Sequence, residues 1–399
     1  MLEKSRPQTE SKSGIDYSLL LPLICHAFSI QLLTALVRVT TSYRILELDL
    51  PVVWLGVVSG TFALLPVFLA VWVGRFIDRG NDARVAWMGS LLMLGPSICF
   101  YYWPGNQFHL LAYTLILGVG HLFIMASHQM LCVRAGGERG RDAAFGNFSV
   151  AQAIGQGVGP MIVGLFGGAA HLPPTHELYG WAAIGMAINV AIGFAIRPIP
   201  PSSRPSREAP RVPVMELMRT PGLLTIMMAS IITITSSDLL TTYLPLLGAE
   251  RQIGVAYIGT ILAVRSTASI FSRFGFARMI RIVGRRRLTV STMVIAGIGF
   301  LGLALPLPVE GLYVASAIMG VGLGISSTLS VSSIAEIVPP ASRGTAMTMR
   351  ITGNRLGQVL VPIVASFIAA GAGAAGVLAV IAANLVGSAV AVHRSTRRD

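Results

Sequence analysis

Charged residues are scarce in this sequence, and their scarcity excludes an ordinary soluble protein. Asp, Glu, Lys and Arg make up 12% of the 399 residues, whereas soluble domains carry about 25%. Hydrophobic residues reach 53% and form long apolar runs. A bilayer crossing needs about 20 apolar residues, so twelve helices would each have about 33 residues for the crossing and its loop. We therefore predict an all-α membrane protein with twelve transmembrane helices.

Cysteine is rare as well, and the common motifs of enzymes are missing. The three cysteines, Cys25, Cys99 and Cys132, all lie inside apolar runs, which favours packing roles over a disulfide framework. A nucleotide-binding loop of the Gly-x4-Gly-Lys type is absent, as is a recognisable nucleophile with its base. We therefore expect no enzymatic activity, no drive by ATP, no cofactor and no metal ion.

Acidic residues are fewer than basic ones, 17 against 30, and the placement of the basic residues indicates topology rather than a nucleic-acid partner. If the N-terminus is cytoplasmic, 24 of the 30 lie on the cytoplasmic side, and only Arg44 and Arg251 lie opposite. Cytoplasmic loops of membrane proteins are enriched in Lys and Arg in this way. We predict a multi-pass protein of the cytoplasmic (inner) membrane with both termini in the cytoplasm.

The second half of the chain repeats the first. The charged segment at 74–84, GRFIDRGNDAR, returns at 277–287 as ARMIRIVGRRR. Residues 141–160 align without gaps on 343–362, at nearly the same displacement. Halves related in this way are common in secondary transporters. The predicted domains are a disordered cytoplasmic tail at 1–16, a six-helix bundle at 17–197, a linker rich in proline, serine and arginine at 198–220, a second six-helix bundle at 221–393 and a cytoplasmic tail at 394–399.

The first of these repeated loops resembles a family signature. Gly74-x3-Asp78-Arg79 with Arg84 resembles the loop between the second and third helices of the major facilitator superfamily of transporters. The resemblance implies that Asp78 latches onto the N-terminus of a helix of the other half, starting near Arg343, in the outward-open state. A carboxylate is stabilised there by the helix dipole and by free N–H groups.

The second copy of the loop lacks the acid of the first. Arg281 stands where an acid is expected, and Gly284 and Arg285 follow it. We therefore expect a latch on one side only.

A second motif is similar to one found in the antiporters of this superfamily. It reads Gly146-x8-Gly155-x3-Gly159-Pro160-x2-Val163-Gly164, with Val163 where glycine is usual. Glycines let helices approach closely, and proline bends a helix. The resemblance implies proton-linked export, in the manner of the twelve-helix drug or metabolite:proton antiporters, whereas helix packing is the alternative explanation.

Few charges lie inside the predicted spans, and these are the candidate functional residues. Asp238 is the only acid well inside a span. It could couple transport to protons or solute, pair with an arginine such as Arg38 or Arg265, or lie at a solvated helix end. Arg38 could extend to the interface or contact solute at the rim of a cavity. Because an embedded arginine costs about 2.5 to 3.5 kcal/mol, arginines inside spans indicate a wet cavity or partners.

Polar residues also cluster on single helix faces. Arg350, Asn354, Gln358 and Arg355 lie within an arc of about 140° on one helix at about 100° per residue. His121, Met125, His128 and Cys132 share one face of the helix at 109–133, which leaves open a soft-metal path, a titratable His121 facing the cavity, or packing. The full set of substrate-binding or coupling candidates is Arg38, His121, Gln152, Gln156, Asp238, Arg265, Arg350, Asn354, Arg355 and Gln358.

The resemblance covers essentially the whole chain and implies alternating access between two pivoting halves. Arginines outnumber acids four to one within the spans, which favours an anionic solute. We expect a monomeric, proton-coupled exporter of small organic molecules in the lipid bilayer, with anionic or amphiphilic solutes preferred. The alternatives are a proton-coupled importer of organic anions and a sensor or partner protein that moves no solute.

Overall fold

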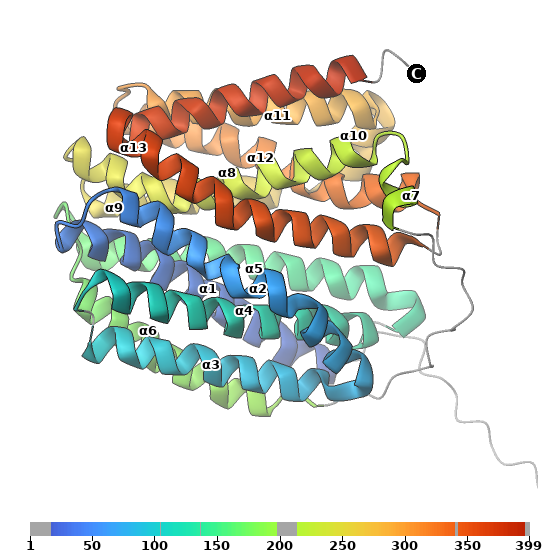
Figure 1. The fold of residues 1–399 in the computed structure, drawn as a ribbon, viewed down its shortest axis with the longest axis horizontal. Helices are drawn as coiled ribbons and strands as arrows, with labels where there is room; N and C mark the ends of the chain where they lie inside the picture. The colour runs from blue at the N-terminus through green and yellow to red at the C-terminus, as the bar shows by residue number, and fades with distance from the viewer. Residues whose placement is uncertain (1–16, 104, 136, 198–213, 340–341, 396–399) are drawn as a thin grey trace, which may run out of the picture.

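The computed structural model describes residues 17–103, 105–135, 137–197, 214–339 and 342–395, and every regular element in these ranges is a helix (Figure 1). In the first half the helices are α1 (Tyr17–Glu47), α2 (Val53–Phe76), α3 (Asp82–Tyr102), α4 (Gln107–Ala135), α5 (Gly137–Gly167) and α6 (Thr175–Phe194), with the short π-helix η1 (Ile77–Asn81) between α2 and α3. In the second half they are α7 (Val214–Met218), α8 (Leu223–Glu250), α9 (Val255–Phe271), α10 (Phe276–Val283), α11 (Arg285–Ala304), α12 (Val309–Ile337) and α13 (Arg343–Ser395).

Ten helices of the described chain are long and apolar enough to cross a membrane. The last of these, α13, contains two crossings, because Gly373 breaks it with φ 65° and ψ −174°. Glu250 accepts the backbone N–H of Ala374 at 3.1 Å just after this break. A further apolar helix, α9, is shorter, with 17 residues. The all-helical membrane fold expected from the sequence is confirmed, and the exact number of twelve crossings stays a prediction.

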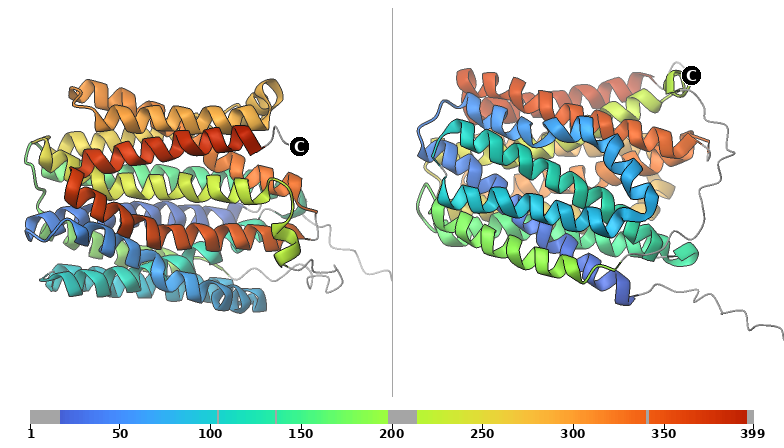
Figure 2. Two further views of the ribbon diagram at one scale, coloured as in Figure 1. Left: turned by 45° about the horizontal axis from the view of Figure 1, so that its top comes forward. Right: turned by 60° about the horizontal axis from the view of Figure 1, so that its bottom comes forward.

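The helices run side by side, with the short helix α7 and the end of α13 at the same end of the bundle (Figures 1 and 2). We call this end, where α1 begins and α13 ends, the terminal face, and the opposite end the far face. The long helices begin alternately at the two faces, and the short helices α7 and α10 precede α8 and α11 in the chain.

The two halves are in close contact near the far face. Backbone N–H groups of Val255 and Ala256 donate to the carbonyl oxygens of Ala170 and Gly168, each at 2.9 Å. A side chain at Gly56 on α2 would collide with the carbonyl oxygen of Pro362 on α13. These contacts hold α2 against α13 and α5 against α9, so the halves leave no wide gap at this end.

Candidate functional site

A cavity of about 560 Å³ lies between the two halves, lined by side chains from both. It extends from Asp238, in the middle of α8, to Arg273 and Thr348, which lie close to the terminal face at the end of α9 and the start of α13. Because the far face is held shut by contacts between the halves, the cavity extends toward the terminal face.

The structure places all ten candidate residues on the wall of this cavity. They come from α1, α4, α5, α8, α9 and α13, so residues from distant parts of the sequence share one space. Their contact with a solute stays a prediction.

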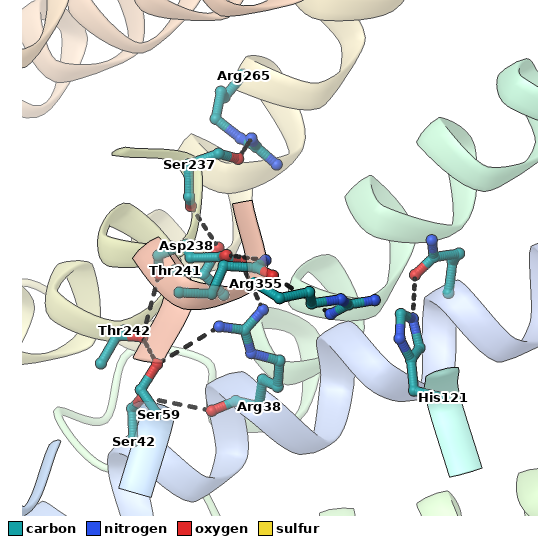
Figure 3. A network of polar contacts seen from close by, with 12 residues as sticks. Arg38, Ser42, Ser59, His121, Ser237, Asp238, Thr241, Thr242, Arg265 and Arg355 are labelled. Atoms are coloured by element: carbon teal, nitrogen blue, oxygen red, sulfur yellow. Dashed lines mark hydrogen bonds and ion pairs between the residues drawn. The ribbon is translucent and has the colours of Figure 1, made fainter. Parts of the chain in front are cut away.

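Asp238 accepts hydrogen bonds on both of its carboxylate oxygens, one from the first half and one from its own half (Figure 3). Arg38 Nη1 on α1 donates to Oδ1 at 2.7 Å, and Gln358 Nε2 on α13 donates to Oδ2 at 2.6 Å. The Arg38 guanidinium also lies 5.2 Å from the centre of the Phe62 ring. Of the roles left open for Asp238, pairing with arginine is present in this structure, and the partner is Arg38.

The other cavity arginines of α9 and α13 bond only to neutral groups in the described part of the chain. Arg265 donates to Ser237 Oγ at 2.7 Å and to Ser266 Oγ at 3.1 Å. Arg350 donates to Ser230 Oγ at 3.1 Å, and Arg355 donates to Gln358 Oε1 at 3.3 Å. Their positive charges are therefore not balanced by described acids in direct contact.

Two of these guanidinium groups also retain free donors. The Nε atoms of Arg265 and Arg350 are buried and have no hydrogen-bond partner among the described residues. Since an unsatisfied buried donor costs about 1 to 3 kcal/mol, this wall of the cavity is suited to an additional acceptor.

The part of the cavity wall that comes from the first half carries fewer charged side chains. Gln31 and Gln152 donate their side-chain amides to the sulfur of Met125 at 3.7 and 3.0 Å. His121 Nε2 lies 3.4 Å from Gln31 Oε1 and faces the cavity. Phe62 and Leu122 add apolar surface, so a wall rich in arginine faces one in which uncharged polar groups and apolar groups are mixed.

The His and Met stripe of α4 divides between two environments. His121 and Met125 line the cavity, whereas His128 is fully buried inside the first half, with its Nε2 2.8 Å from His26 Nδ1. Cys132 is packed in a core cluster. The four side chains therefore do not form one path.

The glycine motif of α5 acts at helix contacts, with one exception. Gly155 and Gly159 lie against the backbone of α1. A Cβ atom added at Gly164 would lie 3.2 Å from the carbonyl oxygen of Ala256 on α9. Nothing described lies within 4 Å of such an atom at Gly146. At Gly146, close helix approach is not seen among the described residues, and its role stays a prediction.

The predicted latch falls partly outside the described side chains. Those of Asp78 and Arg343 are not among them, so their contact stays a prediction. Gly74 has no close neighbour in the described chain, Arg79 is exposed, and Arg84 donates to Asn81 Oδ1 at 3.5 Å. In the second copy, Gly284 adopts a φ of 80° at the start of α11.

Sequence reasoning missed a different acid in this loop. Asp82 is fully buried and forms an ion pair with Arg134 on α4. In the second half, the equivalent positions of the repeat hold Arg285 and Glu336, which also form an ion pair. The repeat therefore retains the positions of an ion pair with its charges exchanged, a signal visible in the sequence once the displacement is known.

Gln31, Gln129 and Arg273 are among the residues of the cavity wall that sequence reasoning missed. The two glutamines could have been found as amides inside apolar spans, as Gln152 and Gln156 were. Arg273 follows the end of α9 and looks like a loop residue in the sequence.

Comparison with known proteins places the chain in a family. The Major Facilitator Superfamily profile matches residues 19–310 and 226–398. The nucleoside transporter NupG is similar in structure, with a TM-score of 0.79, 15% identity and coverage of 95% of this chain and 99% of that one. A bacterial homolog to the human lysosomal transporter Spinster, in an inward-facing and occupied conformation, gives 0.75 and 15%, with 95% and 96% covered.

A POT family transporter in complex with 5-aminolevulinic acid gives a TM-score of 0.76 and 13% identity, with 94% and 95% covered. No curated protein matches the chain significantly in sequence. The structural similarities, at these identities, show the fold, while the profile spans nearly the whole chain. The chain belongs to the Major Facilitator Superfamily.

Proposed function

We propose that this chain transports a small organic anion or anionic amphiphile across the cytoplasmic membrane by alternating access, together with protons. With the terminal face in the cytoplasm, as the distribution of basic residues favours, the structure corresponds to the inward-open state. The sealed contacts of α2 with α13 and α5 with α9 then form the outer gate.

The excess of arginine over acid in the cavity carries the proposal. Arg38, Arg265, Arg273, Arg350 and Arg355 line it, and the one carboxylate of its described lining, Asp238, already pairs with Arg38. This leaves four lining guanidinium groups without an acid from the same wall. Because guanidinium groups bind carboxylate or phosphate through paired charge-assisted hydrogen bonds, an anionic solute supplies the missing acceptors and a cationic one does not.

The opposite wall favours a solute with an apolar part. Phe62, Leu122 and Met125 lie across the cavity from the arginines of α9 and α13. A molecule with an acidic group and a hydrocarbon or aromatic body would contact both walls.

The pair between Arg38 and Asp238 supports cotransport of the anion with a proton. A proton on Asp238 removes the charge that holds Arg38, and the freed guanidinium can then bind the solute anion. Conversely, an anion bound to Arg38 removes the partner of Asp238. Proton and anion therefore favour each other's binding, as linkage requires, and an inward proton gradient would drive import.

Export remains the second candidate, because the α5 motif resembles that of antiporters. Its glycines contact α1 and α9, helices that must move against each other in either direction of transport. A gradient experiment separates the candidates. Proteoliposomes with protein in a single orientation, loaded at pH 7.5 and diluted into pH 5.5, should accumulate labelled organic anions if import is correct.

The reversed gradient gives the discriminating control. Accumulation that requires an acidic lumen would support exchange of solute against protons and contradict import. Solute binding without flux under either gradient would support the sensor alternative and contradict transport.

A further inference from the structure

A second cavity, of about 250 Å³, opens at the terminal face of the second half. It lies among the ends of four helices, α8, α11, α12 and α13, on a different side of α8 and α12 from the central cavity. Ile226, Ala229, Ile337 and Val392 give it apolar walls. Apolar surface that is open at the edge of a membrane is normally covered by a hydrophobic group.

In the first half, buried side chains fill the corresponding space. His26 stands at the position equivalent to Ala229 in the repeat, and it bonds to His128 and Ser90 inside the bundle. Leu23, the equivalent of Ile226, is packed in a core cluster with 1% exposure. The cleft is therefore a feature of the second half, where an alanine replaces a bulky histidine.

Basic side chains surround the mouth of the cleft. Arg285 and Arg286 line it beside Glu336, which pairs with Arg285, and Arg286 also donates to the carbonyl oxygen of His393. Arg287 is exposed next to them. These three arginines begin α11, whose first turn contains no acid and whose N-cap, Gly284, offers no side-chain hydrogen bond. A helix N-terminus also stabilises anions, so the mouth combines basic side chains with the start of a helix.

The neighbouring helix α10 strengthens this basic character. It carries the exposed residues Arg278 and Arg281, together with Ile282, which is 72% exposed. Phe271 and Phe274, just before it, are each 67% exposed. A short amphipathic helix with basic and large apolar side chains is typical of the membrane interface and binds anionic lipids.

The segment at 198–213 does not match the charge of this mouth. It has Arg204, Arg207 and Arg211 against one acid, Glu208, and is therefore net basic.

We propose that the cleft binds one anionic phospholipid of the leaflet at the terminal face. The phosphate contacts Arg286 and Arg287, and one acyl chain enters the apolar cleft between α8 and α12. The inference is independent of the solute and of the direction of transport, since none of these residues lines the central cavity.

The test uses the full-length protein, delipidated in dodecyl maltoside, with native mass spectrometry and thermal unfolding as readouts. Palmitoyl-oleoyl phosphatidylglycerol should bind with at least tenfold higher affinity than the phosphatidylcholine of the same chains, and should raise Tm. R286Q/R287Q should lose at least fivefold in affinity for phosphatidylglycerol. R75Q/R197Q, which removes two exposed arginines at the same face of the first half, should bind like the wild type.

A second variant tests the acyl chain. Thr225→Phe, at a partly exposed lining position, should fill the cleft and weaken phosphatidylglycerol binding at least fivefold. Glycerol 3-phosphate, which offers a charged phosphate without acyl chains, should bind at least tenfold more weakly than the lipid. The proposal would be overturned if the two lipids bound equally well, or if R286Q/R287Q kept the wild-type affinity for phosphatidylglycerol. It would also be overturned if glycerol 3-phosphate bound as tightly as phosphatidylglycerol.

Discussion

Arg38 and Asp238 come from opposite halves of the chain, yet Arg38 Nη1 and Asp238 Oδ1 are separated by 2.7 Å. The pair connects α1 of the first half to α8 of the second and is only 19% and 15% exposed. It therefore contributes to the contact between the halves and also contains the one acid in the described lining of the central cavity.

Asp238→Asn should uncouple transport from protons. The amide keeps the shape and can accept from Gln358, but it cannot exchange a proton or attract Arg38. Counterflow of labelled against unlabelled solute should persist, whereas accumulation driven by a pH gradient should fall at least tenfold. The control is Glu310→Gln, an exposed acid in the first turn of α12, which should leave both assays unchanged. Full gradient-driven accumulation in Asp238→Asn would exclude this acid as the coupling site.

Arg265→Gln and Arg355→Gln should each weaken binding of the solute anion. Hydrogen bonds to charged groups contribute about 1.5 to 3 kcal/mol, which corresponds to a loss of roughly 10- to 150-fold in affinity. The unliganded variants should also unfold at a higher temperature, because a buried charge without an acidic partner is removed. Thermal shift against a panel of organic anions measures both effects, and wild-type affinity in both variants would contradict the anion hypothesis.

Gly56→Ala should shift the protein away from the state seen here. A methyl group at this position collides with the carbonyl oxygen of Pro362, so α2 and α13 must separate at the far face. Distances between spin labels on the loops of the far face should lengthen. Gly146→Ala is the matched control, because its site is open and alanine is favoured over glycine in a helix by about 1 kcal/mol. Unchanged label distances in Gly56→Ala would show that this contact does not hold the gate.

The two symmetry-related ion pairs should differ in their contributions to stability. Asp82→Asn removes the fully buried acid that pairs with Arg134, itself 10% exposed, and breaking a buried pair costs about 3 to 5 kcal/mol. Glu336→Gln affects a pair whose members are 33% and 59% exposed, where the cost is about 0 to 1 kcal/mol. Thermal unfolding in detergent compares the variants, and equal shifts would show that burial does not separate the pairs.

The sequence by itself was sufficient for the helical fold and for ten residues of the cavity wall. Apolar run lengths and the repetition of one half by the other indicate two bundles of helices, because a bilayer imposes helix length and composition directly. The ten candidate residues line the cavity for a related reason. A polar side chain such as Gln152 or Arg265 is tolerated inside an apolar span only beside water or protein, so its presence there locates the cavity.

Only the tertiary structure decided which of these residues are partners. Periodicity gives the direction of a side chain from its own helix axis, but not which helix stands opposite, so Asp238 could have paired with Arg38 or Arg265. The loop at 74–84 has the same ambiguity, since Asp78 and Asp82 lie one turn apart and the fold alone shows that Asp82 turns inward to Arg134. Distances between halves depend on the packing of all helices together, and no local pattern in the chain records them.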